Sequence, residues 1–284
     1  MMSARFLTVV LERAFNMRDG FGREIDYMRI SVIDSCNLNC YYCNPCDNNE
    51  HCHALNILSV KEVLCIVRAA TRLGIKHFRL TGGEPLLHPQ LDEMVLQIKK
   101  IPGVSSVSLT TNAVLLAQHA KWLKEAGIDS INVSLDTIDA SEYERITKKP
   151  LLEEVKHGIN AAIECGIRVK INVVLTPQTD VVALTRYVAK KGTDIRFIEM
   201  MPVGEGHTNG VEPYKKVIGT LSKLYGEPCR INTEKTKEIN SGNDKRKIPD
   251  NGPAEYYIFP ELGIRVGLIQ AIHGKFCATC NRIR

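Results

Sequence analysis

The sequence lacks a long apolar run and lacks the pattern of a cleavable secretory signal. It contains 10 cysteines, but their spacing is unlike the disulfide framework of a small secreted protein. The net charge of +5 comes without a long stripe of lysine and arginine, so it does not support binding to duplex nucleic acid. These absences predict a cytoplasmic protein without a membrane or nucleic-acid partner, whose thiols serve metals and chemistry.

The length of 284 residues, with 44% hydrophobic and 24% charged residues, is sufficient to bury a large core. Residues 1–16 carry a short apolar patch between arginines. A helical extension is favoured over a targeting segment there, because no small-residue cleavage site follows. Met17 is an alternative start. We therefore predict an N-terminal extension over 1–16, a main domain over 17–210 and a C-terminal region over 211–284.

From Met28 onward, apolar runs rich in β-branched residues alternate with segments of helical periodicity. Helices are predicted over Ser59–Leu73, Leu115–Ala126 and Leu151–Cys165, each followed by a glycine suited to ending a helix. The predicted strands are MRISVI, HFRLTG, VSSVSLTT, SINVSLD, RVKINVVL and DIRFIEMMP. This alternation predicts parallel pairing with right-handed crossovers, as an open doubly wound sheet or a barrel.

Polar residues recur near the predicted strand ends, and this favours a barrel. They are Asp34, Thr81, Thr110, Ser134, Lys170 and Glu199. In parallel βα barrels the active site gathers at the C-terminal ends of several strands. The predicted fold is therefore α/β, an incomplete parallel (βα)6 TIM-type barrel. Beyond it we expect a helix over Pro213–Tyr225, a charged loop over Thr233–Asp250 and two short strands before the final FCATCNRIR.

Three cysteines, Cys36, Cys40 and Cys43, form a C-x3-C-x2-C loop after the first predicted strand. Thiolates select zinc, copper(I) or iron–sulfur clusters. Zinc usually takes ligand pairs from two separate places, and an ordinary 4Fe-4S carrier takes four cysteines. The spacing fits a cubane held at three corners, with one iron open to an outside ligand. Two alternatives stay open: Cys46 as a fourth ligand, and a separate zinc site at Cys52 and its flanking histidines.

The segment TGGEP, Thr81–Pro85, follows the next predicted strand. Together with the cysteine loop and the aromatic Tyr42 before its last cysteine, it resembles the radical S-adenosylmethionine (SAM) superfamily. The resemblance implies that SAM chelates the open iron of a 4Fe-4S cluster and that the Gly-Gly-Glu segment lies along its methionine moiety. Glycines permit such close backbone approach, and an acceptor suits an ammonium group.

Within that superfamily, nearly the whole chain from Met17 resembles the GTP 3′,8-cyclases (MoaA family) that begin molybdenum cofactor biosynthesis. The stretches that carry this resemblance are YMRISVIDSCNLNCYYCNP, FRLTGGEPLLHPQL, LTTNAVLL, INVSLDTID, VKINVV, RFIEMMPVG and FCATCNRIR. The terminal stretch is the strongest discriminator. It implies a second three-cysteine 4Fe-4S cluster in the C-terminal extension, whose open iron binds the purine of GTP, so that two clusters face one cavity from opposite ends.

The resemblance also assigns site residues. It implies Cys36, Cys40 and Cys43 on the SAM cluster, and Cys277 and Cys280 on the GTP cluster. The positions matching SAM contacts are Tyr42, Gly83, Ser134 and Met201. Those matching GTP contacts are Arg29, Arg79, Thr110, Lys170, Arg282, Ile283 and Arg284. Inward-facing cations on strands are costly unless an anion such as a triphosphate meets them. The alternative for these strand cations is ion pairing to Asp34 or Glu199.

The implied reaction begins with reductive cleavage of SAM to methionine and a 5′-deoxyadenosyl radical. This radical takes a hydrogen atom from the ribose 3′ carbon of GTP, and the substrate radical then attacks carbon 8 of guanine. The protein supplies position, electrostatics and exclusion of water. An electron donor of unidentified nature is implied as a partner, and a homodimer is one alternative for the oligomeric state.

Two departures from the family pattern lead to alternatives. The family supplies a third cysteine for the second cluster beyond the terminal motif, so we expect this chain to be truncated and its second cluster to be incomplete. In TTNA, Ala113 stands where the family usually has glycine. The alternatives are a single-cluster radical SAM enzyme acting on another substrate, and a non-catalytic iron–sulfur or zinc protein.

Overall fold

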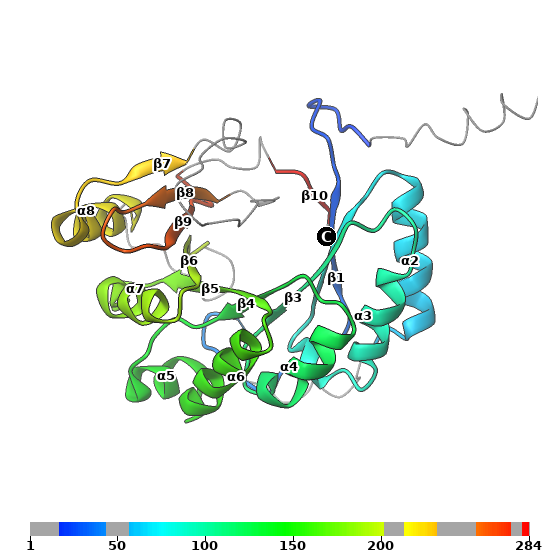
Figure 1. The fold of residues 1–284 in the computed structure, drawn as a ribbon, viewed down its shortest axis with the longest axis horizontal. Coiled ribbons are helices and arrows are strands. Elements are labelled where there is room, and N and C mark those ends of the chain that lie inside the picture. The colour runs from blue at the N-terminus through cyan, green and yellow to red at the C-terminus, as the bar shows by residue number, and fades with distance from the viewer. Residues whose placement is uncertain (1–16, 44–56, 202–212, 232–253, 274–279, 284) are drawn as a thin grey trace, which may run out of the picture.

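The computed structural model describes residues 17–43, 57–201, 213–231, 254–273 and 280–283 (Figure 1). The first strands are β1 (Tyr27–Ser31), β2 (His77–Thr81), β3 (Ser106–Thr111), β4 (Ser130–Ser134), β5 (Arg168–Leu175) and β6 (Asp194–Glu199). They are followed by β7 (Cys229–Ile231), β8 (Glu255–Ile258), β9 (Arg265–Ile269) and β10 (Arg282–Ile283). Within the described residues these strands form one 10-stranded sheet in the order β10-β1-β2-β3-β4-β5-β6-β9-β8-β7.

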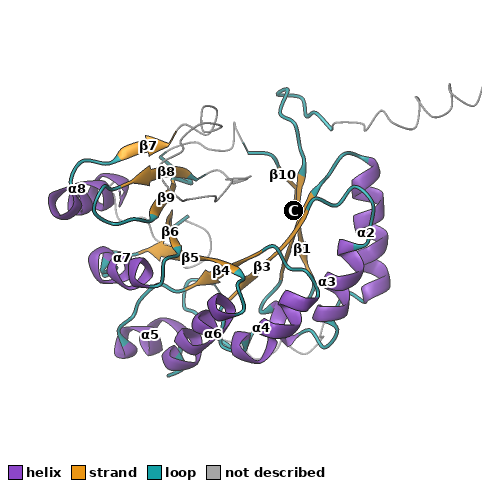
Figure 2. Cartoon of the chain, viewed as in Figure 1, coloured by secondary structure: helices purple, strands orange, loops and turns teal. Residues whose placement is uncertain are grey.

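The helices lie along the outer side of this curved sheet (Figures 1 and 2). They are α2 (Val60–Arg72), α3 (Leu91–Lys99), α4 (Leu116–Glu125), α5 (Ala140–Thr147), α6 (Leu152–Glu164), α7 (Val181–Lys190) and α8 (Pro213–Tyr225), with a short 3-10 turn at Pro85–Leu87. Ser59 and Glu62 form a capping box at the start of α2. Gly74 and Gly127 follow α2 and α4 with φ of 92° and 90°, which explains why these helices end there.

Neighbouring strands from β1 to β6 are all parallel, and β10 and β9 extend the two sides in parallel to β1 and β6. Only β7, β8 and β9 pair in antiparallel fashion among the described strands. The incomplete parallel barrel expected from the sequence is thus confirmed. The alternation also implied helices after β2 and β5, where α3 and α7 lie, but without bounds. The helix α5 and the short strands β7 and β10 were not predicted.

The two faces of the sheet differ in polarity. Phe78 and Leu80 on β2 are fully buried, and they pack with the apolar side chains that face the helices. The alternate positions face the inside of the curve and are polar although buried, as Arg79, Lys170 and Arg196 show. Ordinary barrels of this kind fill their interior with branched apolar side chains. A polar interior therefore indicates a ligand site along the inner face.

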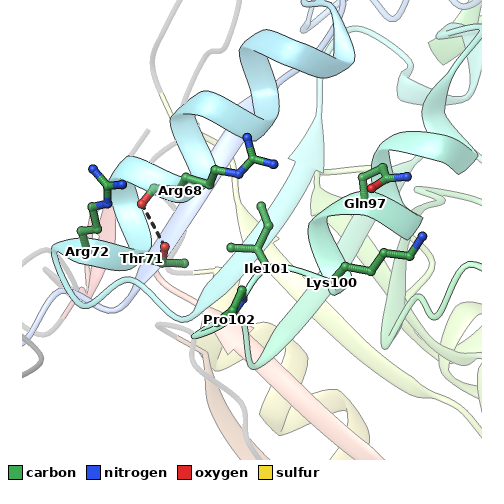
Figure 3. A pocket seen from close by; sticks show the side chains of 7 residues that line it. All are labelled: Arg68, Thr71, Arg72, Gln97, Lys100, Ile101 and Pro102. Carbon is green, nitrogen blue, oxygen red and sulfur yellow. Dashed lines mark hydrogen bonds between the residues drawn. The ribbon is translucent and has the colours of Figure 1, made fainter. Parts of the chain in front are cut away.

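The outer surface carries a cavity of about 340 Å³ between α2 and α3 (Figure 3). It is lined by Arg68, Thr71, Arg72, Gln97, Lys100, Ile101 and Pro102. These residues lie at the C-terminal ends of the two helices, where cations complement the exposed carbonyl groups. Because each helix leads from there to the start of the next strand, this cavity lies at the end of the barrel opposite to the strand ends.

Several expectations concern residues outside those that the structure describes: the extension over 1–16, the charged loop over Thr233–Asp250, and the alternative ligands Cys46 and Cys52. Among the described helices, none combines the length and the apolar character needed to cross a bilayer. The division of the chain at residue 210 stays a prediction.

Candidate active site

The loop after β1 presents its three cysteines on the side where the strands end. Cys36 and Cys43 are exposed, and Cys40 is half-buried. Burial, together with the neighbouring Asp136 carboxylate and the other two thiols, raises the pKa of Cys40 to about 12. In the part of the chain that the structure describes, no group of three or more His, Cys, Asp or Glu side chains is gathered around a single ion position. The fit to a cluster therefore rests on the donor set, three thiols from one loop, of which Cys36 and Cys43 both raise the pKa of Cys40.

The main chain of the cysteine loop is attached to the end of α5. The amide of Asn39 donates to the carbonyl of Thr147 at 3.0 Å, and the amide of Tyr41 donates to that of Ile146 at 3.1 Å. The last carbonyls of a helix have no partner within the helix, so they are free to accept bonds from another segment. The helix end thereby fixes the path of the loop between its first and last cysteines.

A buried carboxylate adds a side-chain attachment to this loop. The hydroxyl of Tyr42 donates to Asp136, just beyond β4, and the amide of Val174 on β5 donates to the same carboxyl group at 2.7 Å. Burial raises the pKa of Asp136 to about 6, although both hydrogen bonds lower it. Burial and the nearby Asp136 charge raise the pKa of Tyr42, so its hydroxyl stays protonated and donates.

The glycines of TGGEP lie against the backbone that leads into the cysteine loop. A Cβ atom on Gly82 would lie 2.3 Å from the carbonyl oxygen of Ile33, and one on Gly83 would lie 2.2 Å from that of Ser35. The close approach is held by the amide of Gly83, which donates to Ile33 at 2.7 Å, and by that of Glu84, which donates to Ser35 at 2.8 Å. Both glycines are thus required by packing within the chain itself, whereas the sequence-based reasoning attributed them to the approach of SAM.

Glu84 was expected to offer an acceptor to an ammonium group, but the structure turns its carboxylate inward. The side chain is buried, and it accepts from the hydroxyl of Thr111 and the amide of Asn112, both at 2.7 Å. Burial raises the pKa of Glu84, and these hydrogen bonds oppose the rise. The Asn112 side chain donates to Asn37 at 2.7 Å and lies 3.8 Å from the sulfur of Cys36. Glu84 therefore positions a polar group beside a predicted cluster ligand.

The inner face of the barrel carries the cations assigned by resemblance. Arg29 lies on β1, Arg79 on β2 and Lys170 on β5, and Arg79 Nη1 donates to Thr110 on β3 at 3.4 Å. Ser134 at the end of β4 and Met201 just after β6 are exposed, on the same side as the cysteine loop. The structure brings these residues to one face, and their individual roles stay predictions.

Arg196 on β6 is a further cation that the sequence-based reasoning missed. It is only 3% exposed, and in register it stands between Asn172 and Gly267 on the inner face. Its Nε and Nη2 atoms are buried without a hydrogen-bond partner among the described residues. The oxygen of the Asn172 amide is in the same state. Buried polar groups without partners are costly, so these atoms make this part of the inner face a candidate site for a polar ligand.

Two carboxylates near the cations are already engaged. Asp194 on β6 accepts two bonds from the guanidinium of Arg265, one of them from Nε at 3.1 Å. Glu199, at the end of β6, accepts from the amide of Ile272 at 2.8 Å and from the ring of His273. Glu199 thereby connects β6 to the segment that leads to the terminal cysteine motif. This differs from the expected alternative, in which Glu199 would pair with a cation on a strand.

The terminal motif returns to the first strand. The side chain of Asn281 donates to Asp26 at 2.6 Å, and β10 pairs in parallel with Tyr27 and Met28. Cys280, half-buried, therefore lies at the start of β1, while the cysteine loop follows its end. A strand of five residues spans about 17 Å, so the cysteine loop and Cys280 lie at opposite ends of the barrel wall. Ile283 is half-buried on β10, and Cys277 and Arg284 lie outside the described residues.

Comparisons with known proteins identify the family of the chain. Residues 30–184 match the family model of the radical SAM superfamily, and residues 193–284 match that of Molybdenum Cofactor Synthesis C. GTP 3′,8-cyclases from Clostridium perfringens and Pelotomaculum thermopropionicum are each 37% identical over 94% of this chain and 80% of their own length.

Solved structures show the same fold. Streptococcus suis SuiB bound to S-adenosylmethionine gives a TM-score of 0.58 at 17% identity, covering 70% of this chain and 47% of that one. Native anSMEcpe with bound AdoMet gives 0.56 at 19% identity, over 70% and 59% of the two chains. The match to the superfamily model extends over more than half of the sequence, and the cyclases match most of its length. The chain therefore belongs to the radical SAM superfamily and, within it, to the GTP 3′,8-cyclase family.

Proposed function

We propose that this protein is a GTP 3′,8-cyclase, which joins the ribose 3′ carbon of GTP to carbon 8 of its guanine in the first step of molybdenum cofactor biosynthesis. The observation that carries the proposal is the row of buried cations Arg79, Lys170 and Arg196 on the inner face, with the cysteine loop and Cys280 at opposite ends of the barrel wall. A triphosphate supplies the negative charge that such a row needs. The thiols of the cysteine loop and of the terminal motif would supply cluster ligands on either side of this row.

Cys36, Cys40 and Cys43 would hold the 4Fe-4S cluster that binds SAM, with Tyr42, Gly83, Ser134 and Met201 against SAM. When bound, the cluster and SAM together supply the carbon radical that takes a hydrogen atom from the substrate. The residues of the chain itself fix its position, because the end of α5 and Asp136 hold the loop, and Gly82 and Gly83 allow the strand end to approach it. Tight positioning matters, because a misplaced radical would attack the protein.

For GTP, we propose contacts to Arg29, Arg79, Thr110, Lys170, Arg282, Ile283 and Arg284, and we add Arg196 on the strength of its buried guanidinium. A buried cation is stabilised when an anion accepts its hydrogen bonds. Cys277 and Cys280 would contribute to a second 4Fe-4S cluster at the purine end.

The remaining elements of the proposal concern partners and place. An electron donor is required, because cleavage of SAM consumes an electron. We include a cytoplasmic location, the absence of nucleic-acid and membrane partners, a homodimer as the candidate oligomer, and the division into 1–16, 17–210 and 211–284. The reducing cytoplasm suits a protein whose thiols must stay available for iron.

The activity is tested by anaerobic reconstitution with iron and sulfide, followed by incubation with SAM, dithionite and GTP. We expect 5′-deoxyadenosine that depends on GTP, together with a cyclised nucleotide identified by mass spectrometry. Cys43→Ala is expected to abolish both, and Cys65→Ala serves as the matched control, because Cys65 is an exposed thiol on α2 outside the motif. Cleavage of SAM that ignores GTP would favour another substrate, and no cleavage despite an intact cluster would favour a non-catalytic protein.

The nucleotide contact is tested separately at Arg196. Arg196→Met is expected to weaken GTP binding about tenfold or more, because hydrogen bonds to a charged group are lost. Arg72→Met, which removes an exposed cation from the outer cavity, is the matched control. Equal GTP affinities for the two variants would remove Arg196 from the proposed site.

A further inference from the structure

Tyr27 lies between two of the cations assigned to GTP. It is a buried residue of β1. The guanidinium carbon of Arg282 on β10 is 5.0 Å from the centre of its ring, and that of Arg79 on β2 is 5.8 Å away. The Nε of Arg79 also donates to the Tyr27 hydroxyl. One ring thus contacts two arginines that come from strands on either side of it.

Tyr256 repeats this arrangement on the other side of the barrel. It is a buried residue of β8, and its ring centre is 5.9 Å from Nζ of Lys170 on β5 and 5.8 Å from the guanidinium carbon of Arg265 on β9. Arg265 is already paired with Asp194, so Lys170 is the member of this pair that we assign to the nucleotide. Again one ring contacts two cations from different strands.

An aromatic ring differs from a carboxylate as a partner for a cation. Both attract the cation, but the ring is uncharged and leaves the positive charge available to an anion. A carboxylate at the same place would neutralise the charge and would repel phosphate oxygens. Two cations that point into one cavity also repel each other, and a ring placed against both keeps their side chains in place.

From this geometry we propose that Tyr27 and Tyr256 are positioning residues, which hold Arg79, Arg282 and Lys170 in the nucleotide cavity without neutralising them. The inference deepens the proposed function and rests on it, because it takes these cations as the GTP contacts. Neither tyrosine is assigned a contact with the reacting atoms. The two tyrosines would increase the affinity for the triphosphate of the nucleotide.

Gly267 on β9 supports the placement of the second ring. A Cβ atom there would lie 2.9 Å from Cε1 of Tyr256 and 2.6 Å from Cγ of Arg196. The glycine therefore leaves the space in which the ring and the arginine side chain lie next to each other. Gly267→Ala changes neither side chain chemically, yet it must displace at least one of them. Because Arg196 is itself a proposed GTP contact, this variant reports on Tyr256 and Arg196 together.

The test compares Tyr27→Leu, Tyr256→Leu and Tyr256→Phe with the wild-type protein, all reconstituted with iron and sulfide. Tyr187→Leu is the matched control, because the ring of Tyr187 on α7 holds Lys191 at 5.7 Å outside the barrel. Equilibrium dialysis without SAM measures the affinity for GTP and, separately, for guanosine. Binding of SAM, which requires the open iron of the first cluster, reports whether that cluster is intact.

We expect the two tyrosine-to-leucine variants of the barrel to weaken GTP binding about tenfold, because each loses two cation–π contacts. Tyr256→Phe, which keeps the ring, is expected to bind GTP as the wild type does. Guanosine binding and SAM binding are expected to change little, since neither involves the phosphate groups of GTP. Gly267→Ala is expected to weaken GTP binding in the same selective way.

Three results would overturn the inference. If the wild type binds GTP but the barrel variants bind it as well as Tyr187→Leu does, the positioning role is wrong while the proposed function stands. Equal losses of GTP and guanosine affinity would show general damage to the cavity instead of positioning of cations. If the wild-type protein binds no GTP, the proposed function fails and takes the inference with it.

Discussion

Replacing Gly83 by alanine is expected to destabilise the protein strongly, because of a contact between two backbone segments. The added Cβ atom would lie 2.2 Å from the carbonyl oxygen of Ser35 and 2.5 Å from that of Asp34. Neither oxygen is the end of a flexible side chain, so the segments must move apart. That movement lengthens the hydrogen bonds from Gly83 to Ile33 and from Glu84 to Ser35, which measure 2.7 and 2.8 Å.

The magnitude follows from these two effects. Overpacking of a well-packed site costs about 1–3 kcal/mol. Two lost backbone hydrogen bonds add about 1 kcal/mol each. Gly83→Ala is therefore expected to lower the free energy of unfolding by about 3–5 kcal/mol, a large part of the ~5–15 kcal/mol that holds a typical domain together. The same movement displaces the cysteine loop, so iron uptake on reconstitution is expected to fall as well.

Urea unfolding of the iron-free protein, followed by circular dichroism, measures this change. Gly219→Ala in α8 is the matched control, because no heavy atom lies within 4 Å of the added methyl group. There the same substitution is expected to stabilise the protein by about 0.5–1 kcal/mol, since alanine favours the helix. An error of about 1 kcal/mol is usual for a free energy of unfolding measured in this way. The expectation is therefore contradicted if the free energy of unfolding of Gly83→Ala lies within that error of the wild-type value and the variant takes up iron normally.

Three further predictions concern stability. Arg265→Met is expected to lower the free energy of unfolding by about 3–5 kcal/mol in urea titrations, because it leaves Asp194 buried without its main ion-pair partner; a loss below 1 kcal/mol would contradict this. Burial alone would raise the pKa of Glu199, but hydrogen bonds from the segment before the terminal motif lower it below 4.5. As the pH falls below about 4.5, the melting temperature of the wild type is therefore expected to fall more steeply than that of Glu199→Gln. If the melting temperatures of the two proteins depend on pH in the same way, the assignment is wrong. Ala113 is buried with a φ of 66°, so Ala113→Gly relieves about 1 kcal/mol of left-handed strain. In urea titrations its loss in free energy of unfolding is expected to be smaller than that of Ala120→Gly in α4 by about 1 kcal/mol or more. Equal losses would argue against strain.

The order of strands and helices could be predicted because its signals are local. Alternation of β-branched runs with helical periodicity sets the barrel, and glycines such as Gly74 and Gly166 mark the helix ends, where the structure gives both a positive φ. The three-cysteine loop and the TGGEP segment were sufficient to predict the superfamily, which the comparisons confirm. These features depend on short stretches of sequence and on their order.

The partners of the buried polar groups could not be predicted, because they come from distant positions. Tyr42 and Asp136 are separated by 94 residues, and Thr111 and Glu84 by 27. Arg196 looks in sequence like an ordinary strand residue, and only the register of β6 with its neighbours places it on the inner face. Ala113 was noted as a departure from the family pattern, but its left-handed conformation follows from the tertiary structure.

The bond between Asn281 and Asp26 joins residues 255 positions apart, and this separation has a consequence for the synthesis of the protein. The contacts that hold the cysteine loop to α5 and Asp136 involve no residue beyond Val174. A ribosome-bound chain has the residues for that half of the site once Val174 has emerged, whereas Cys280 reaches β1 only after Arg282 has been made. Contacts of long sequence separation also form slowly. The two proposed cluster sites are therefore expected to mature in sequence, with the cysteine loop ready for iron before Cys280 has reached β1.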